Sequence, residues 1–127
     1  MHRHYSPASV KQPLPIALAV AAFVCACTST EAAGPQQTVR IFKSLGSVQC
    51  SGGGSDLAAL SRQLATAGVR IESSTCGTDG RMHTALCGAN DGRIAIFEVE
   101  EKDLQSAAKL GFASLTKLPE ATSSSCQ

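Results

Sequence analysis

The chain has 127 residues, of which 43% are hydrophobic, and it carries 11 basic and 10 acidic side chains for a formal net charge of +1. It contains no Trp and a single Tyr. A chain this close to neutral and this poor in aromatic side chains lacks the basic surface and the stacking platforms of nucleic-acid-binding proteins, so that class is excluded.

The N-terminal part has the layout of an export signal. An apolar run from Leu14 to Ala26 follows a basic stretch that includes Arg3 and Lys11. A charged start, a short apolar middle and small residues at the end are typical of a signal peptide. As a helix the run would span about 20 Å, which is shorter than the roughly 30 Å hydrocarbon core of a bilayer. We therefore predict a signal peptide over residues 1–26 rather than a membrane-spanning helix.

The end of this run suggests lipidation. The residues Val24-Cys25-Ala26-Cys27 resemble the lipobox of bacterial lipoproteins. The resemblance implies a diacylglycerol thioether on Cys27, cleavage before it and a fatty acid on its new amino group. Thr28, rather than Asp, follows Cys27, which implies an outer-membrane protein that faces the periplasm. In the alternative, signal peptidase cuts after Ser29 or Ala32 and releases a soluble periplasmic or secreted protein.

Composition divides the rest of the chain into three parts. Residues 27–37 are small, polar and interrupted by Pro35, which is typical of a flexible tether. Residues 38–118 are long enough for a single compact domain. The serine-rich residues 119–127 are predicted to be a disordered tail.

The first half of the domain predicts a strand, a helix and a second strand. Residues 38–45 are rich in β-branched and aromatic side chains, which favours a strand. Leu57, Leu60 and Leu64 recur at helical spacing, so we expect a helix over 56–67 with Ser55 as its N-cap. Residues 69–75 alternate like a half-buried strand.

The second half continues in the same way. Residues 93–99 form the clearest strand signal in the chain, residues 101–110 a second helix, and residues 112–118 a short final strand. Residues 82–88 fit either a strand or part of a long loop.

This order of elements predicts an α+β fold. We expect a small, mostly antiparallel sheet with two helices on one face, in a split βαβ (ferredoxin-like) plan. Residues 82–88 would add an extra hairpin strand if they pair. The other face of the sheet would be open, and it or the cysteine-bearing end would be the contact surface.

One long stretch of the domain resembles known proteins. The sequence Cys-Gly-Ala-Asn-Asp-Gly-Arg-Ile-Ala-Ile-Phe-Glu-Val, which begins at Cys87, precedes a helix that ends in Leu-Gly-Phe. With its surroundings from Val39 to Phe112, it resembles small uncharacterised exported proteins and lipoproteins of Gram-negative bacteria. The resemblance implies no catalytic residue.

The four cysteines after the signal are candidates for disulfides. A small exported domain buries a modest core, and disulfides usually supplement it. Cys76 and Cys87 are near each other in sequence and flank a turn, so they are the favoured pair. Cys50 with Cys76 or with Cys87 is nearly as plausible, and Cys126 would take the remaining partner.

A metal centre is the alternative use of the same residues. Cys76, His83 and Cys87 offer soft ligands to copper or zinc. The spacing matches no established zinc motif, and an oxidising compartment favours disulfides over thiolates.

Three weaker patterns have structural explanations. The glycine-rich stretch before Asp56 lacks the Lys of a phosphate-binding loop. The acidic residues around position 100 suit a helix N-terminus. A Ser-His-Asp set could use His83 with Asp79 or Asp91, but no nucleophile motif accompanies it.

The sequence therefore predicts a non-catalytic binding or structural domain of the cell envelope. It would need no cofactor and would bind neither nucleic acid nor nucleotide. Its partners would be the membrane, through the lipid anchor, and an envelope protein. Metal handling is the alternative function.

Overall fold

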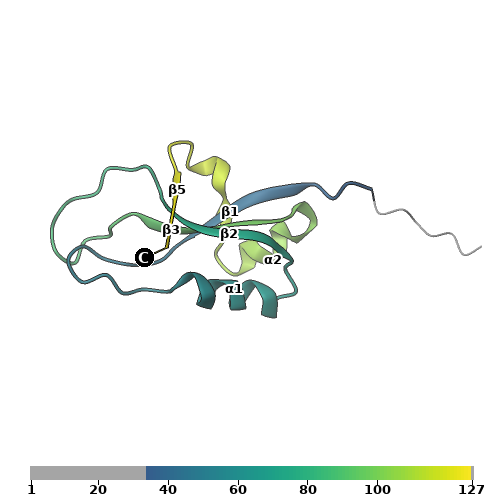
Figure 1. Cartoon of the computed structure of the whole chain (residues 1–127), viewed down its shortest axis with the longest axis horizontal. Coiled ribbons are helices and arrows are strands. Elements are labelled where there is room, and N and C mark those ends of the chain that lie inside the picture. Colours follow the sequence, from purple (N-terminus) through teal and green to yellow (C-terminus); the bar gives the residue numbers. More distant parts are fainter. Residues whose placement is uncertain (1–33, 127) are drawn as a thin grey trace, which may run out of the picture. The chain divides into compact units, whose positions relative to one another are not determined.

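The computed structural model describes residues 34–126, which form a five-stranded antiparallel sheet with two α-helices (Figure 1). The sheet order is β4-β1-β3-β2-β5. In chain order the elements are β1 (Thr38–Ser44), α1 (Leu57–Thr66), β2 (Ile71–Thr78), β3 (Arg93–Glu100), the 3-10 turn η1 (Glu101–Asp103), α2 (Leu104–Lys109), β4 (Ala113–Ser114), the 3-10 turn η2 (Leu115–Lys117) and β5 (Thr122–Ser124).

Strand β3 is the centre of the sheet, and its sequence explains why. It pairs with β1 on one side and with β2 on the other. Ile94 and Ile96 are buried on one face, whereas Phe97 and Val99 are buried on the opposite face. A strand covered on both faces needs a continuous apolar run, and residues 94–97 supply one.

Both helices cover the same face of the sheet, as the sequence predicts (Figure 1). Leu60 and Leu64 of α1 and Ala107 of α2 share one core with Phe97. Phe112, which follows α2, packs edge-on against Phe97 with ring centroids 5.7 Å apart. These aromatic and aliphatic contacts fix the helices against the sheet.

Lys43 of β1 joins the two helices on this face. Its ammonium group donates hydrogen bonds to the Gln63 Oε1 of α1 (3.1 Å) and to the carbonyl of Leu110, just after α2 (2.7 Å). The same nitrogen lies 5.0 Å from the centre of the Phe112 ring. A cation at the C-terminus of a helix is favourable, so Lys43 stabilises the end of α2 while its stem packs on the core.

The opposite face is only partly open, which corrects the expectation of a bare sheet. Leu118 is buried against Ile94 and Ile96, with Leu115 and Ala121 packed beside it. In Figure 1 the chain between β4 and β5 lies on the side of the sheet away from α1 and α2. The predicted strand over 112–118 shrinks to two residues because the chain leaves the sheet edge to cover this apolar patch.

Residues 119–127 are predicted to be a disordered tail, but the described part of this segment, residues 119–126, contains a strand. Residues 122–124 form β5, which pairs with the C-terminal end of β2. Cys126 is then bonded to Cys76. The sequence does not predict β5 because this short, exposed edge strand is rich in serine and has no apolar pattern.

Residues 82–88 do not form a strand, so the extra strand of the sheet is β5 and not a hairpin at this position. These residues belong to a loop over 79–92 that joins β2 to β3. The sequence Asn90-Asp91-Gly92, which is typical of a turn, lies inside this loop, where Asn90 Oδ1 accepts a hydrogen bond from the Gly92 N–H at 2.7 Å. It makes a local side-chain turn instead of a two-residue hairpin.

Helix α1 begins one residue later than predicted. Asp56 is its N-cap and accepts a hydrogen bond from the Ala59 N–H at 2.5 Å. Ser55 instead donates its backbone N–H to the carbonyl of Leu45 at 2.7 Å. The chain returns from the glycine-rich turn close to the end of β1, and this contact moves the cap to Asp56.

The predicted signal peptide, Cys27 and most of the tether lie outside the described residues. Within residues 34–126, no helix is both long and apolar enough to cross a bilayer.

Candidate functional site

Two disulfides lie at the end of the sheet where β1 finishes and β3 starts. Cys50 is bonded to Cys87, with Cα atoms 5.1 Å apart, and Cys76 is bonded to Cys126, with Cα atoms 5.0 Å apart. The favoured pairing of Cys76 with Cys87 is therefore wrong, whereas the alternative of Cys50 with Cys87 is confirmed. Disulfides of this kind are typical of an oxidising compartment outside the cytosol.

Strand geometry explains the pairing. Cys76 lies within β2, two residues before its end, and faces Ser124 of β5. The neighbouring strand thus brings Cys126 alongside Cys76, while Cys87 lies at the far end of the β2–β3 loop. Cys50 adopts a φ of +70°, a conformation that side chains other than glycine rarely take, and its bond to Cys87 holds it there.

The β1–α1 loop (residues 45–56) and the β2–β3 loop (residues 79–92), here called the paired loops, are held together by more than this disulfide. Gln49 donates its N–H to the carbonyl of Ala89 at 2.8 Å and accepts from the Gly88 N–H at 3.1 Å. The buried hydroxyl of Ser47 donates to Asp91 Oδ1 at 2.7 Å. These hydrogen bonds hold the two long loops side by side.

Gly54 allows the β1–α1 loop to fold back on itself. Its φ is +80°, and a Cβ here would lie 2.0 Å from the carbonyl oxygen of Leu45. A glycine is therefore required at this position by a close backbone approach.

His83 and Asp79 form the main polar pair of the β2–β3 loop. The Nε2 atom of His83 lies 2.9 Å from Oδ1 and 3.0 Å from Oδ2 of Asp79, and Asp79 Oδ1 also accepts from the Arg81 N–H at 2.9 Å. Burial raises the pKa of Asp79, but the hydrogen bonds from Arg81 and His83 and their positive charge outweigh it, so the pKa is lowered overall.

This pair lines a cavity of about 350 Å³. The floor is apolar, with Phe42, Ile94 and Leu118, and polar groups lie around it. The lining residues are Phe42, Ser44, Asp79, Arg81, His83, Asn90, Ile94 and Leu118. A small apolar hollow with a few convergent polar groups and a perturbed carboxylate is the usual form of a binding site. We call it the loop cavity.

The residues of the predicted metal centre do not come together. Cys76 and Cys87 are bonded to different cysteines, and His83 pairs with Asp79 instead. Among residues 34–126, no group of three or more His, Cys, Asp or Glu side chains is arranged to hold a metal ion.

The Ser-His-Asp combination is only partly assembled. Asp79 is the aspartate that pairs with His83, whereas Asp91 bonds to Ser47 and to the Arg93 N–H. Ser44 lines the loop cavity with this pair, but its Oγ accepts from the Gly46 N–H at 3.1 Å. A nucleophile must be in hydrogen-bond contact with its base.

The acidic residues near position 100 have separate structural roles. Glu98 accepts hydrogen bonds from the hydroxyls of Thr38 and Ser73 on the sheet surface, which lower its pKa. Asp103 accepts the Arg70 N–H at 3.1 Å. Glu98 and Asp103 each have a separate structural partner.

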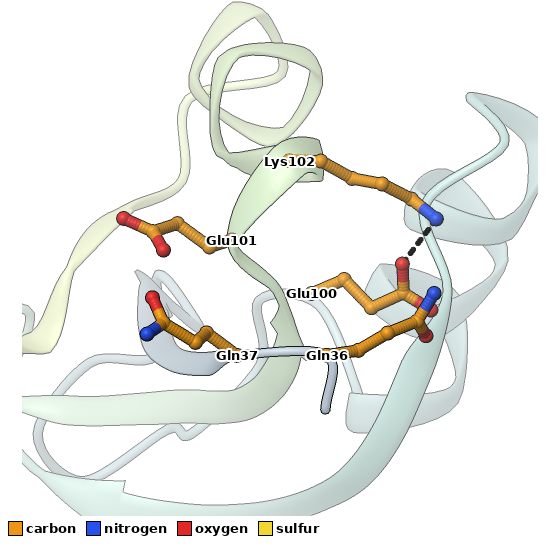
Figure 2. A pocket seen from close by; sticks show the side chains of 5 residues that line it. All are labelled: Gln36, Gln37, Glu100, Glu101 and Lys102. Atoms are coloured by element: carbon orange, nitrogen blue, oxygen red, sulfur yellow. Dashed lines mark ion pairs between the residues drawn. The ribbon is translucent and has the colours of Figure 1, made fainter. Parts of the chain in front are cut away.

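Glu100 is the buried member of this group and lines a second cavity, of about 270 Å³, at the opposite end of the sheet (Figure 2). Lys102 pairs with its carboxylate, which raises the pKa of Lys102, and the Arg70 guanidinium lies 3.7 Å away. Figure 2 shows Glu100 and Lys102 on one side of the chain and Glu101 on the other. Because two cations already compensate Glu100, we assign it to holding the turn after β3.

Sequence reasoning misses most of the loop cavity. Arg81, Asn90, Phe42 and Leu118 come from β1, the β2–β3 loop and the segment before β5, and no local pattern connects them. Only His83 and Asp79 carry a signal, because they are a histidine and an aspartate four residues apart in the same loop.

Comparison with protein-family models, curated proteins and solved structures finds no match to this chain.

Proposed function

We propose that this chain is an exported, lipid-anchored cell-envelope protein whose disulfide-bonded domain binds an envelope partner without catalysis. The observation that carries the proposal is the oxidation of all four cysteines at positions 50, 76, 87 and 126 into two bridges. Such bridges persist outside the reducing cytosol, and residues 1–26 have the pattern of a signal peptide that would be cleaved before Cys27.

The proposed fold plan is the split βαβ, ferredoxin-like arrangement with an added edge strand. Its support is the strand order: β1 and β2 are both antiparallel to β3 and lie on either side of it, while β4 borders β1. In this plan β5 is the addition, and Cys126 fastens it.

The geometry of the sheet favours a binding role for the paired loops. Thr38, the first residue of β1, pairs with Glu100, whereas Ser44, the last, pairs with Ile94 next to the β2–β3 loop. Residues 34–37 therefore lead into one end of the sheet and the paired loops lie at the other (Figure 1). A domain tethered through residues 27–37 would carry these loops away from its attachment point.

The β2–β3 loop also presents apolar side chains to solvent. Met82 is fully exposed and Leu86 is 72% exposed, and they are the large apolar side chains left open in the described part of the chain. Next to them lies the loop cavity, with Arg81 and His83 at its edge. Apolar anchors beside a partly polar hollow suit contact with another protein.

The anchor is tested by fractionation of cells that express the full chain. Cys27→Ala should move the protein from the membrane fraction to the soluble periplasmic fraction, because it removes the sulfur that would carry the diacylglycerol thioether. Cys25→Ala is the matched control, since it changes a neighbouring cysteine and leaves Cys27 intact. A Cys27→Ala protein that stays in the membrane fraction would count against lipidation.

The binding surface is tested with a photo-crosslinking residue at Met82. In the native envelope we expect a discrete crosslinked product at this position, and none with the same residue at Arg62, which is exposed on α1. Excess unlabelled wild-type protein should suppress the product. Equal crosslinking at both positions, or none at Met82, would contradict a role for the β2–β3 loop.

A further inference from the structure

The two disulfides interleave along the chain. The bridges join Cys50 to Cys87 and Cys76 to Cys126, so the first cysteine of the domain pairs with the third and the second with the fourth. Neither bridge links cysteines that are neighbours in sequence. Native pairing therefore requires either that Cys76 stay unbridged to both of its sequence neighbours until it meets Cys126, or that a bridge to one of them be exchanged afterwards.

Loop closure in the unfolded chain works against this arrangement. The native bridges span 37 and 50 residues. Cys76 and Cys87 are only about 11 residues apart, so an unfolded chain closes that loop about tenfold more readily than the one from Cys76 to Cys126. If loop length alone decided, only about one molecule in seven would acquire the native pair of bridges.

The position of Cys126 adds to the difficulty. It follows the other three cysteines of the domain in the chain, and its partner Cys76 is only 3% exposed in the folded domain. During export the chain is delivered from its N-terminus, so the other three cysteines reach the oxidising compartment first. This step rests on the proposed export.

We infer that this chain depends on a thiol–disulfide isomerase of the oxidising compartment as a folding partner. The isomerase is a dithiol protein that exchanges wrongly paired bridges, and its substrates here are the forms that contain Cys76–Cys87 or Cys50–Cys76.

The exchange is balanced without an added oxidant. From the form bridged Cys76–Cys87 and Cys50–Cys126, the isomerase thiolate attacks the Cys76 sulfur and Cys87 leaves as a thiolate. Cys87 then attacks Cys50, which forms the first native bridge and frees Cys126. Cys126 attacks the mixed disulfide at Cys76, so the second native bridge forms and the isomerase leaves in its original reduced state.

The pairing can be read directly by peptide mapping. Trypsin cuts after Lys43, Arg62, Arg70, Arg81, Arg93 and Lys117, among other sites, and so places each of the four cysteines in a separate peptide. Each possible bridge therefore gives a linked pair of distinct mass.

The experiment starts from the reduced, unfolded full chain carrying Cys25→Ser and Cys27→Ser. It is oxidised in a glutathione buffer with or without a purified disulfide isomerase. Without the isomerase we expect non-native pairs to predominate at first, and with it we expect native pairs to accumulate at least several-fold faster. Native bridges that form first, and at the same rate in both samples, would overturn the inference.

A matched control separates pairing from folding. The same chain with Cys50→Ala and Cys87→Ala can form only the Cys76–Cys126 bridge, so its oxidation should not respond to the isomerase. A second arm expresses the exported chain in a Gram-negative host with or without its periplasmic isomerase. Fully reduced cysteines in both hosts would contradict the proposed export, whereas native pairing in both hosts would contradict the isomerase dependence.

Discussion

At the scale of single residues, two aspartates determine how the β2–β3 loop is held. Asp79 accepts from His83 and from the Arg81 N–H near the start of the loop, and Asp91 accepts from Ser47 and from the Arg93 N–H near its end. For each, burial raises the pKa, but the hydrogen bonds to the charged form lower it overall below the ordinary value of 3.8. The hydrogen bonds that hold the loop therefore favour the ionised form of both aspartates.

This predicts a loss of stability in acid. A carboxyl whose pKa is lowered by folding stabilises the native state above its unfolded pKa, and this stabilisation disappears as the pH falls through the folded pKa. We expect the free energy of unfolding to drop below about pH 4, where both aspartates take up protons. Urea denaturation at several pH values from about pH 3 to pH 7 measures this change in the free energy of unfolding.

Asp79→Asn isolates one contribution. At pH 7 the substitution should lower the free energy of unfolding by about 1–2 kcal/mol, because His83 and Arg81 lose a charged acceptor. It should also reduce the pH dependence in the acid range. The exposed Glu120→Gln is the control. An Asp79→Asn protein with the wild-type pH dependence would show that the pair is not coupled to folding.

Glycines of the same loop offer a matched pair of substitutions. Gly92 and Gly88 have φ values of +76° and +87°, but only at Gly92 would a Cβ meet neighbours, 2.5 Å from His83 Nε2 and 2.9 Å from Asp79 Oδ1. Both alanine variants carry the cost of a left-handed conformation, about 1 kcal/mol. Gly92→Ala should cost clearly more, because it also displaces the His83–Asp79 pair.

Thermal unfolding of the two variants checks this. Equal losses of stability would mean that His83 can move aside without cost, and the pair would then have little structural importance.

At the scale of elements, the C-terminal strand β5 buries no side chain and is held in place by a disulfide. β5 has three residues, all exposed, and pairs only with the end of β2. Such a short edge strand has little stability of its own. Its place is secured by the Cys76–Cys126 bond, by the Thr78–Thr122 hydroxyl contact at 3.0 Å and by the hydrogen bond from Arg40 to Ser123.

Removal of this bridge should therefore destabilise the domain and release β5. The chain-entropy model assigns about 4 kcal/mol to a loop of this length, and we expect a loss of about 2–4 kcal/mol for Cys76→Ala with Cys126→Ala. Hydrogen exchange should show that protection of β5 amides is lost while β3 amides stay protected. Protected β5 amides in that variant would mean that strand pairing alone holds the segment.

At the scale of the whole molecule, the sheet separates two ends with different character. One end receives residues 34–37 and contains Glu100, a buried carboxylate that is ion-paired with Lys102 and Arg70. The other contains both disulfides, the loop cavity and the exposed Met82. Because Glu100 at the first end is already ion-paired with Lys102 and Arg70, we place the binding surface at the second end.

The sequence alone determined the main elements, because each has a strong local signal. The apolar run of β3, the leucine spacing of α1 and the small residues of α2 predicted the antiparallel sheet with two helices on one face. The sequence also indicated that Cys50, Cys76, Cys87 and Cys126 would form disulfides, because a domain this small has a limited core and needs additional stabilisation.

Only the tertiary structure decided which of those sulfurs meet. Proximity along the chain favours Cys76 with Cys87, but strand pairing sets Cys126 beside Cys76 and the paired loops bring Cys50 to Cys87. The loop cavity and β5 could not be predicted either, because each depends on contacts between segments that are far apart in sequence. Local patterns report backbone preference and burial, whereas distant contacts depend on the packing of the complete sheet.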